Sequence, residues 1–144
     1  MKKDKRFLVA IVDDNDLYST MIKYVLSTDK DVDIMTFDTA EEFMKCFSFR
    51  PNLIVLDHYL KGINGLSALK PLKELHKNVP IIVMSSQRDI DVVIDYMNNG
   101  ASDYIVKNDE GLELLKKEVE AIKNSEPYLE KNILNQIYRY FIPA

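Results

Sequence analysis

The chain has 144 residues, a length that fits one domain with enough buried surface to need no disulfide or structural metal. Its formal net charge is −4, whereas a nucleic-acid-binding domain usually carries a basic patch. The single cysteine, Cys46, excludes an internal disulfide and favours a reducing compartment. The basic first residues lack the pattern of a signal peptide, and no apolar run approaches the roughly 20 residues that span a membrane. We therefore expect a cytoplasmic globular domain that binds neither nucleic acid nor membrane directly.

Apolar runs and helical patterns alternate five times along the chain. The expected strands, mostly continuous Val, Ile and Leu runs, are 7–12, 32–37, 53–57, 80–85 and 103–106. Apolar residues at three- and four-residue spacing predict helices over 15–28, 39–48, 64–76, 89–98 and 110–123. Pro71 is expected to kink or shorten the third of these helices. This alternation predicts an α/β fold, with a doubly wound parallel sheet that helices cover on both faces.

A further helical pattern follows the fifth helix. Ser125-Glu126-Pro127 is typical of a helix end followed by a new helix start, and 127–141 then carries apolar residues on one side. We therefore expect one domain over 5–124 and a C-terminal helical extension over 125–144. The apolar face of this extension either folds back onto its own domain or contacts a partner, such as a second copy of the chain in a homodimer.

Polar residues stand at the ends of four of the five expected strands. Asp13 and Asp14 follow the first, Asp57 ends the third, Ser85 ends the fourth and Lys107 follows the fifth. In an open parallel α/β sheet, ligands bind outside the carboxyl ends of the strands. We therefore expect three carboxylates, one hydroxyl and one ammonium to converge on a single site.

Three carboxylates at one site cannot all stay ionised without a partner. Two ionised carboxylates within about 5 Å repel each other by roughly 3 kcal/mol at an effective dielectric near 20. Either a pKa rises or a cation binds, and oxygen ligands suit Mg²⁺ better than Zn²⁺. A carboxylate beside Mg²⁺ can attack phosphorus and become an acyl phosphate, whose oxygens Lys107 and Ser85 could contact. The simpler interpretation is a polar loop over 13–16 that caps the next helix, beside a solvated lysine and an ordinary turn serine.

In their order and spacing, five segments resemble the receiver domain of two-component response regulators, similar to chemotaxis regulators. The segments are Val12-Asp13-Asp14, Leu56-Asp57, Met84-Ser85-Ser86, Asn99-Gly100-Ala101-Ser102-Asp103-Tyr104 and Val106-Lys107. The resemblance covers about residues 5–124. It implies a flavodoxin-like five-stranded sheet with the strand order 2-1-3-4-5.

The resemblance also implies the chemistry of the site. Asp57 would accept a phosphoryl group from a histidine kinase or phosphotransfer protein in a phosphorelay. Asp13, Asp14 and Asp57 would bind Mg²⁺, with the backbone carbonyl of His58 as a further ligand.

Signal output follows from the same resemblance. Ser85 and Lys107 would contact the phosphoryl group, and Tyr104 would turn inward when the Ser85 hydroxyl moves toward the phosphate. The surface formed by about 86–122 would then change shape and bind a downstream protein.

Two features depart from the receiver pattern. The family usually has Lys-Pro with a cis peptide bond, whereas Lys107 is followed by Asn108. A cis bond without proline costs about 3 kcal/mol, so we expect this peptide to be trans or strained. Tyr59, two residues after Asp57, is bulky enough to shield an acyl phosphate from water, which predicts a fairly long-lived phosphoryl form.

Three alternatives stay open. A pseudo-receiver would bind partners without phosphorylation. Asp14-Asn15-Asp16 has the Asp-x-Asp spacing of haloacid-dehalogenase-like phosphohydrolases, but Tyr18 stands where that family has Thr or Val. A flavin-binding module needs a phosphate-cradling loop after the first strand, and the acidic loop here would repel phosphate. We expect a phosphoacceptor, not an enzyme, that acts as a stand-alone receiver because no output domain follows.

Overall fold

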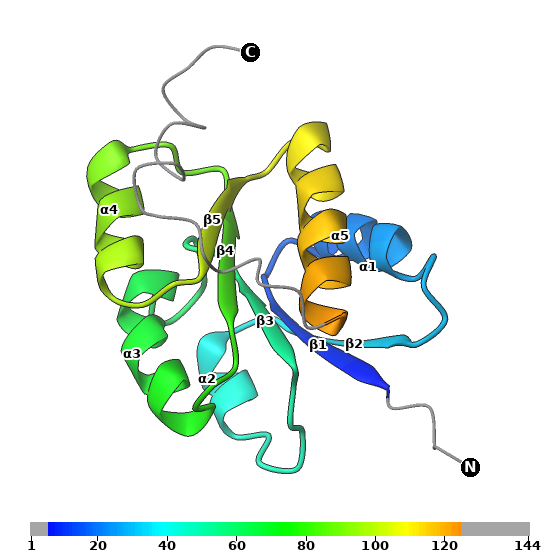
Figure 1. Cartoon of the computed structure of the whole chain (residues 1–144). Coiled ribbons are helices and arrows are strands. Elements are labelled where there is room, and N and C mark those ends of the chain that lie inside the picture. The colour runs from blue at the N-terminus through cyan, green and yellow to red at the C-terminus, as the bar shows by residue number, and fades with distance from the viewer. Residues whose placement is uncertain (1–5, 125–144) are drawn as a thin grey trace.

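The computed structural model describes residues 6–124, in which strands and helices alternate as predicted (Figure 1). The strands are β1 (Phe7–Val12), β2 (Val32–Phe37), β3 (Leu53–Leu56), β4 (Ile81–Ser85) and β5 (Asp103–Val106). The helices are α1 (Asp16–Leu26), α2 (Ala40–Met44), α3 (Gly65–Leu75), α4 (Ile90–Asn98) and α5 (Asp109–Lys123). The predicted extension over 125–144 lies outside the described residues. Within 6–124, none of the helices has the length and apolar character needed to cross a bilayer.

The five strands form one all-parallel sheet in the order β2-β1-β3-β4-β5, which confirms the predicted fold class. Helices α1 and α5 cover one face, and α2, α3 and α4 cover the other (Figure 1). The chain runs from β1 outward to β2, then crosses back past β1 to β3 and continues to β4 and β5, so the sheet reverses its winding at β1. Ligands bind at such a reversal, outside the carboxyl ends of the strands.

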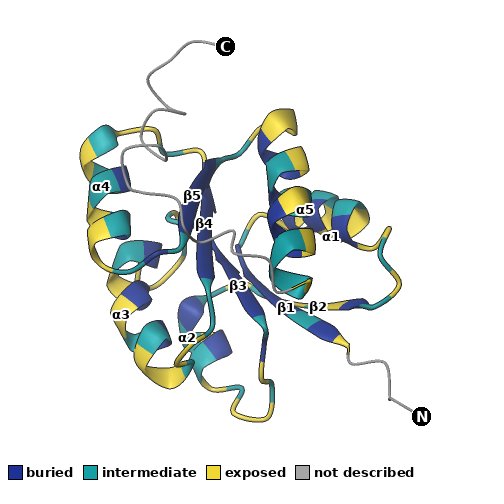
Figure 2. Ribbon diagram, in the orientation of Figure 1, coloured by how far each residue is buried: buried dark blue, intermediate teal, exposed yellow. Residues whose placement is uncertain are grey.

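Successive residues of the central strands face opposite layers of the core. Ala10 and Val12 of β1 pack toward α2, α3 and α4, whereas Val9 and Ile11 pack toward α1 and α5. All four residues are fully buried, and β3 and β4 are buried along their whole length (Figure 2). Burial on both faces explains why these strands read as continuous apolar runs in the sequence.

Helix α2 is shorter than the sequence predicts. It ends at Met44, before the expected boundary at 48, and Phe47 is 73% exposed in the loop that follows. Ala40 and Phe43 bury the inner side of α2 within a single turn, and Pro51 then disfavours helical backbone at the residue before it. Pro71 does not shorten α3, which continues to Leu75.

Candidate functional site

Three carboxylates meet where β1 and β3 end. Asp13, Asp14 and Asp57 each place one oxygen within 4.8 Å of the other two. The strands bring them together because Val12 pairs with Leu56, and the Asp57 amide donates to the Val12 carbonyl at 3.0 Å. Asp13 and Asp57 are buried, whereas Asp14 is partly exposed. The predicted convergence of these three residues is therefore present in the structure.

Lys107 places its ammonium between two of these carboxylates. Its Nζ lies 2.8 Å from Oδ2 of Asp13 and 2.9 Å from Oδ2 of Asp57. The Lys107 amide donates to the Ser85 carbonyl at 2.9 Å, which extends the pairing of β5 with β4 up to the site. The ammonium also lies 4.7 Å from the centre of the Tyr18 ring, a cation–π arrangement. Lys107 thus binds the Asp57 carboxylate directly in this structure.

Burial and ion pairing act against each other at this cluster. Burial raises the pKa of Asp13, although hydrogen bonds from Lys107 and from the Asn15 amide oppose the rise. Burial alone lowers the pKa of Lys107, but its hydrogen bonds and charge interactions with Asp13 and Asp57 outweigh burial, and the net pKa is raised. Lys107 therefore stays positively charged, and the carboxylates outnumber the cation that pairs with them.

The donor set fits Mg²⁺. Oxygen atoms from three carboxylates suit a hard divalent cation, and no cysteine or histidine ring nitrogen belongs to this cluster. The His58 carbonyl is less free to bind metal, because it accepts the Gly65 amide at 3.0 Å. That hydrogen bond uses one of the two lone pairs of the carbonyl oxygen. The role of His58 as a backbone ligand stays a prediction.

Ser85 ends β4, Tyr104 of β5 interacts electrostatically with Asp57, and both residues are fully buried. The Ser85 hydroxyl accepts the Gln87 amide at 3.2 Å, and the Tyr104 hydroxyl donates to the Gln87 carbonyl at 2.6 Å. Burial raises the pKa of Tyr104 to about 12, so its hydroxyl stays a neutral donor near pH 7. Tyr104 is therefore already buried inside the domain in this structure, and its role as a switch stays a prediction.

Two contacts near the site were not predicted from the sequence. Tyr96 of α4 is fully buried and its hydroxyl lies 2.7 Å from Nδ1 of His58. His58 is therefore half-buried and partnered. Gln87 donates from Nε2 to the Tyr59 hydroxyl at 2.8 Å. Helical spacing from Val93 would have placed Tyr96 on the inner face of α4, but nothing in the sequence pairs it with His58.

The fold and the site together define an α/β domain with an acidic cluster at the reversal point of its sheet. The sequence profile of the response regulator receiver domain matches residues 9–120. Because this match covers most of the chain, the chain belongs to the response regulator receiver domain family.

Known relatives agree with this assignment. The chain is 28% identical over 104 residues to the DNA-binding transcriptional regulator NtrC of Klebsiella pneumoniae, covering 72% of this chain and 22% of NtrC. It is 28% identical over 130 residues to a Bacillus subtilis protein named probable C4-dicarboxylate response regulator DctR, covering 89% of this chain and 57% of DctR. A two-component response regulator from Clostridium difficile has a similar solved structure, with a TM-score of 0.74 and 26% identity, covering 83% of this chain and 97% of that one. The chain spans less than two thirds of the length of NtrC and of DctR.

Family membership places the chain in two-component signalling. Receiver domains are phosphoacceptors, generally not classed as enzymes, that bind Mg²⁺ in an acidic pocket and interact with histidine kinases or phosphotransfer proteins. The cluster of three aspartates is consistent with such a pocket.

Proposed function

We propose that this chain is a switch in which Asp57 accepts a phosphoryl group from a histidine kinase or phosphotransfer protein. The observation that carries the proposal is the cluster itself: a buried acceptor carboxylate, two further carboxylates within 4.8 Å, and a lysine ammonium 2.9 Å from Asp57. Asp13 and Asp14 would hold Mg²⁺ together with Asp57. The proposed setting is the cytoplasm, in keeping with the reducing compartment that a lone cysteine favours.

The transfer step needs little beyond positioning and charge. A carboxylate oxygen of Asp57 attacks phosphorus, the phosphorus–nitrogen bond to the donor histidine breaks, and the electron pair returns to the imidazole, which takes up a proton. Lys107 and the Ser85 hydroxyl would donate hydrogen bonds to the phosphoryl oxygens. Mg²⁺, when bound, offsets the negative charge that the carboxylates and the phosphoryl group bring together.

The output step follows from the neighbours of Ser85. Movement of the Ser85 hydroxyl toward the phosphoryl group would weaken its contact with the Gln87 amide. The Gln87 carbonyl accepts the Tyr104 hydroxyl, so the same movement would reach β5 and the surface over 86–122. The inward Tyr104 of this structure supports a shift between existing populations, with phosphorylation favouring one of them. A downstream protein would bind that surface, and a homodimer through 125–144 stays a prediction.

Intact-mass spectrometry after incubation with acetyl phosphate and Mg²⁺ tests this function. We expect the mass of one phosphoryl group to be added to the wild type, to need Mg²⁺, and to be missing in Asp57→Asn. Asp16→Asn is the matched control, because Asp16 is an exposed aspartate in the first turn of α1. The adduct should decay slowly and lose this persistence in Tyr59→Ala.

Other outcomes would identify other functions. No adduct in the wild type, with no binding of the phosphoryl mimic fluoroberyllate, would indicate a pseudo-receiver that binds partners without phosphorylation. Continuous release of phosphate from a small aryl phosphate would favour a phosphohydrolase.

A further inference from the structure

Five residues around Asp57 form a closed circuit of contacts, in which Gln87 takes part through both its side chain and its backbone carbonyl. The five are His58, Tyr59, Gln87, Tyr104 and Tyr96. The rings of His58 and Tyr59 meet edge to face with centres 5.1 Å apart. Hydrogen bonds then join Tyr59 to Gln87 at 2.8 Å and Gln87 to Tyr104 at 2.6 Å. The Tyr104 and Tyr96 rings lie 5.6 Å apart, and the Tyr96 hydroxyl returns to His58 at 2.7 Å.

The circuit connects four parts of the fold. His58 and Tyr59 follow Asp57 at the end of β3, Gln87 lies in the loop between β4 and α4, and Tyr104 belongs to β5. Tyr96 is the member that belongs to α4. Helix α4 is therefore joined directly, through Tyr96 and His58, to the residues that follow β3, Asp57 to Tyr59, which we call the acceptor loop. A second, indirect connection runs through Ser85, Gln87 and Tyr104.

Tyr96 has no room to move independently of the acceptor loop. It is fully buried, and its hydroxyl occupies space that Gly65 leaves open by having no side chain. A Cβ at Gly65 would lie 2.6 Å from that hydroxyl and would also meet the carbonyl oxygen of Asp57. The Tyr96 hydroxyl, the start of α3 and the Asp57 backbone thus share one closely packed point. In such packing, a shift of one group displaces its neighbours.

We propose that Tyr96 is a positioning residue through which a change at Asp57 reaches α4 directly, in parallel with the route through Ser85 and Tyr104. A movement of the acceptor loop would displace Tyr96 through its hydrogen bond to His58. The contact between the two rings would keep Tyr96 in step with Tyr104. The two routes meet in the Tyr96–Tyr104 ring pair, so α4 and β5 would respond together. This proposal rests on the proposed phosphorylation of Asp57.

Amide hydrogen exchange of α4, with Mg²⁺ and with or without fluoroberyllate, tests the proposal on the full chain. Tyr96→Phe removes the hydroxyl but keeps the ring that contacts Tyr104. We expect the change in α4 exchange rates on adding fluoroberyllate to be about fivefold smaller than in the wild type, the size expected for one lost hydrogen bond. Fluoroberyllate affinity, followed separately by fluorine NMR, should change less than α4 exchange. Tyr24→Phe is the matched control, because Tyr24 is 78% exposed on α1.

A second variant keeps the test decisive. His58→Ala removes the other partner of the hydrogen bond at a half-buried position, where circular dichroism can verify the fold. In a double-mutant cycle, the effects of His58→Ala and Tyr96→Phe on α4 exchange should not add, because both remove the same bond. Additive effects, or an unchanged α4 response in Tyr96→Phe, would overturn the proposal and leave the function of Asp57 intact. Failure of the wild type to bind fluoroberyllate would overturn both.

Discussion

Lys107 neutralises part of an acidic cluster and leaves a surplus of negative charge. When ionised, Asp13, Asp14 and Asp57 carry three negative charges against the single positive charge of Lys107, a surplus of two. The charge of Mg²⁺ matches that surplus. The ammonium contacts Oδ2 of Asp13 and of Asp57, whereas Oδ1 of Asp13 accepts the Asn15 amide at 2.9 Å and Oδ1 of Asp57 accepts the Tyr59 amide at 3.4 Å. A carboxylate oxygen that accepts one hydrogen bond keeps a lone pair with which it can bind a metal ion.

Replacing this lysine with an uncharged residue of similar shape should therefore make the fold depend on metal. In Lys107→Met, we expect the free energy of unfolding in EDTA to fall by about 3 kcal/mol, because buried carboxylates lose their partner. Mg²⁺ should restore much of this loss, since a ligand at 100 times its dissociation constant stabilises the folded state by about 2.7 kcal/mol. Urea denaturation with and without Mg²⁺ measures both effects.

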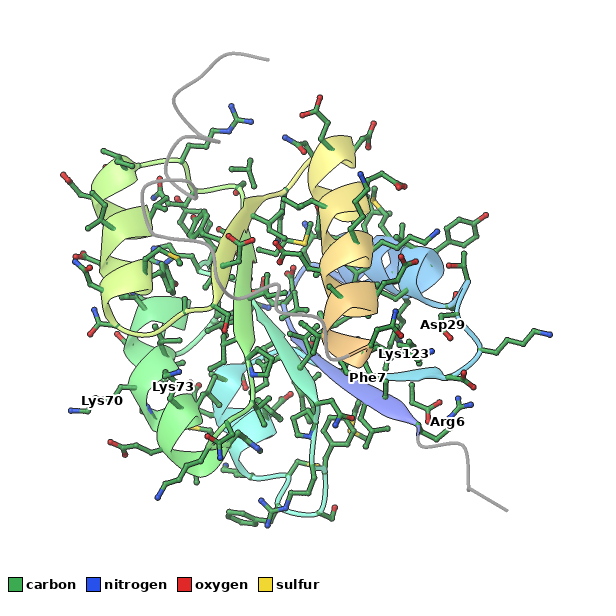
Figure 3. All side chains as sticks on the ribbon, in the orientation of Figure 1. Arg6, Phe7, Asp29, Lys70, Lys73 and Lys123 are labelled. Carbon is green, nitrogen blue, oxygen red and sulfur yellow. The ribbon has the colours of Figure 1, made fainter. Side chains whose placement is uncertain are left out.

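Lys70→Met is the control for Lys107→Met, because Lys70 is an exposed lysine on α3 (Figure 3). It should alter neither stability nor the response to Mg²⁺. Equal stability of Lys107→Met and the wild type in EDTA would mean that the ion pair does not hold the carboxylates together.

The residues of the site differ in how far the sequence could predict them. Asp57, Ser85 and Lys107 could be found because each stands where an apolar run ends, and parallel strands bring such ends to one edge. The contact between Tyr96 and His58 could not, since it depends on how deeply α4 packs against the sheet and on the space beside Gly65. Periodicity shows which side of a helix is buried, but it does not show which side chain lies opposite.

At the scale of elements, α5 begins with a cap that depends on Asn108. The Asn108 side-chain oxygen accepts the Gly111 amide at 2.7 Å, and the Asn108 backbone is extended, with φ −164° and ψ −179°. In the described part of the chain every peptide bond is trans. The bond between Lys107 and Asn108 is therefore trans as well. An asparagine at this position thus fixes the start of α5 directly after the lysine of the site.

Loss of this cap should weaken the start of α5 and leave the rest of the domain in place. We expect Asn108→Ala to lower the free energy of unfolding by about 1 kcal/mol, because an orphan amide of the first turn loses its acceptor. Asn108→Ser keeps an oxygen at the cap and should cost clearly less. Chemical denaturation of the two variants side by side measures the difference. Equal losses would show that the asparagine acts through its size and not through its hydrogen bond.

Whole-molecule architecture was predictable in part. Alternating strands and helices already define a parallel α/β domain, but periodicity does not order the strands, and the order 2-1-3-4-5 came from family resemblance. The edge position of β2 has only a weak sequence signal, the polar residues Asp33 and Thr36 within the strand; in the structure Asp33 and Met35 are exposed. Long-range pairs, such as Lys123 with Asp29 at 2.7 Å (Figure 3), depend on helix placement and have no local signal.

Buried tyrosines make the whole fold sensitive to alkaline pH. Burial raises the pKa of Tyr18 and of Tyr104 to about 12, and it raises the pKa of Tyr96 further. These residues belong to α1, β5 and α4, so they reach into the layers on both sides of the sheet. An unfolded tyrosine has a pKa of about 10. The folded state therefore holds these protons more tightly, and the stability they contribute is complete below pH 10 and lost as pH rises toward 12.

Unfolding above pH 10 should therefore be cooperative and coupled to tyrosine ionisation. We expect the phenolate absorbance of the buried tyrosines to rise together with the loss of circular dichroism. Tyr18→Phe should move the alkaline midpoint upward, because it removes one of the ionisable groups whose pKa burial raises. The phenylalanine ring would still lie beside the Lys107 ammonium. Complete ionisation of every tyrosine while circular dichroism stays native would show that burial does not hold these protons.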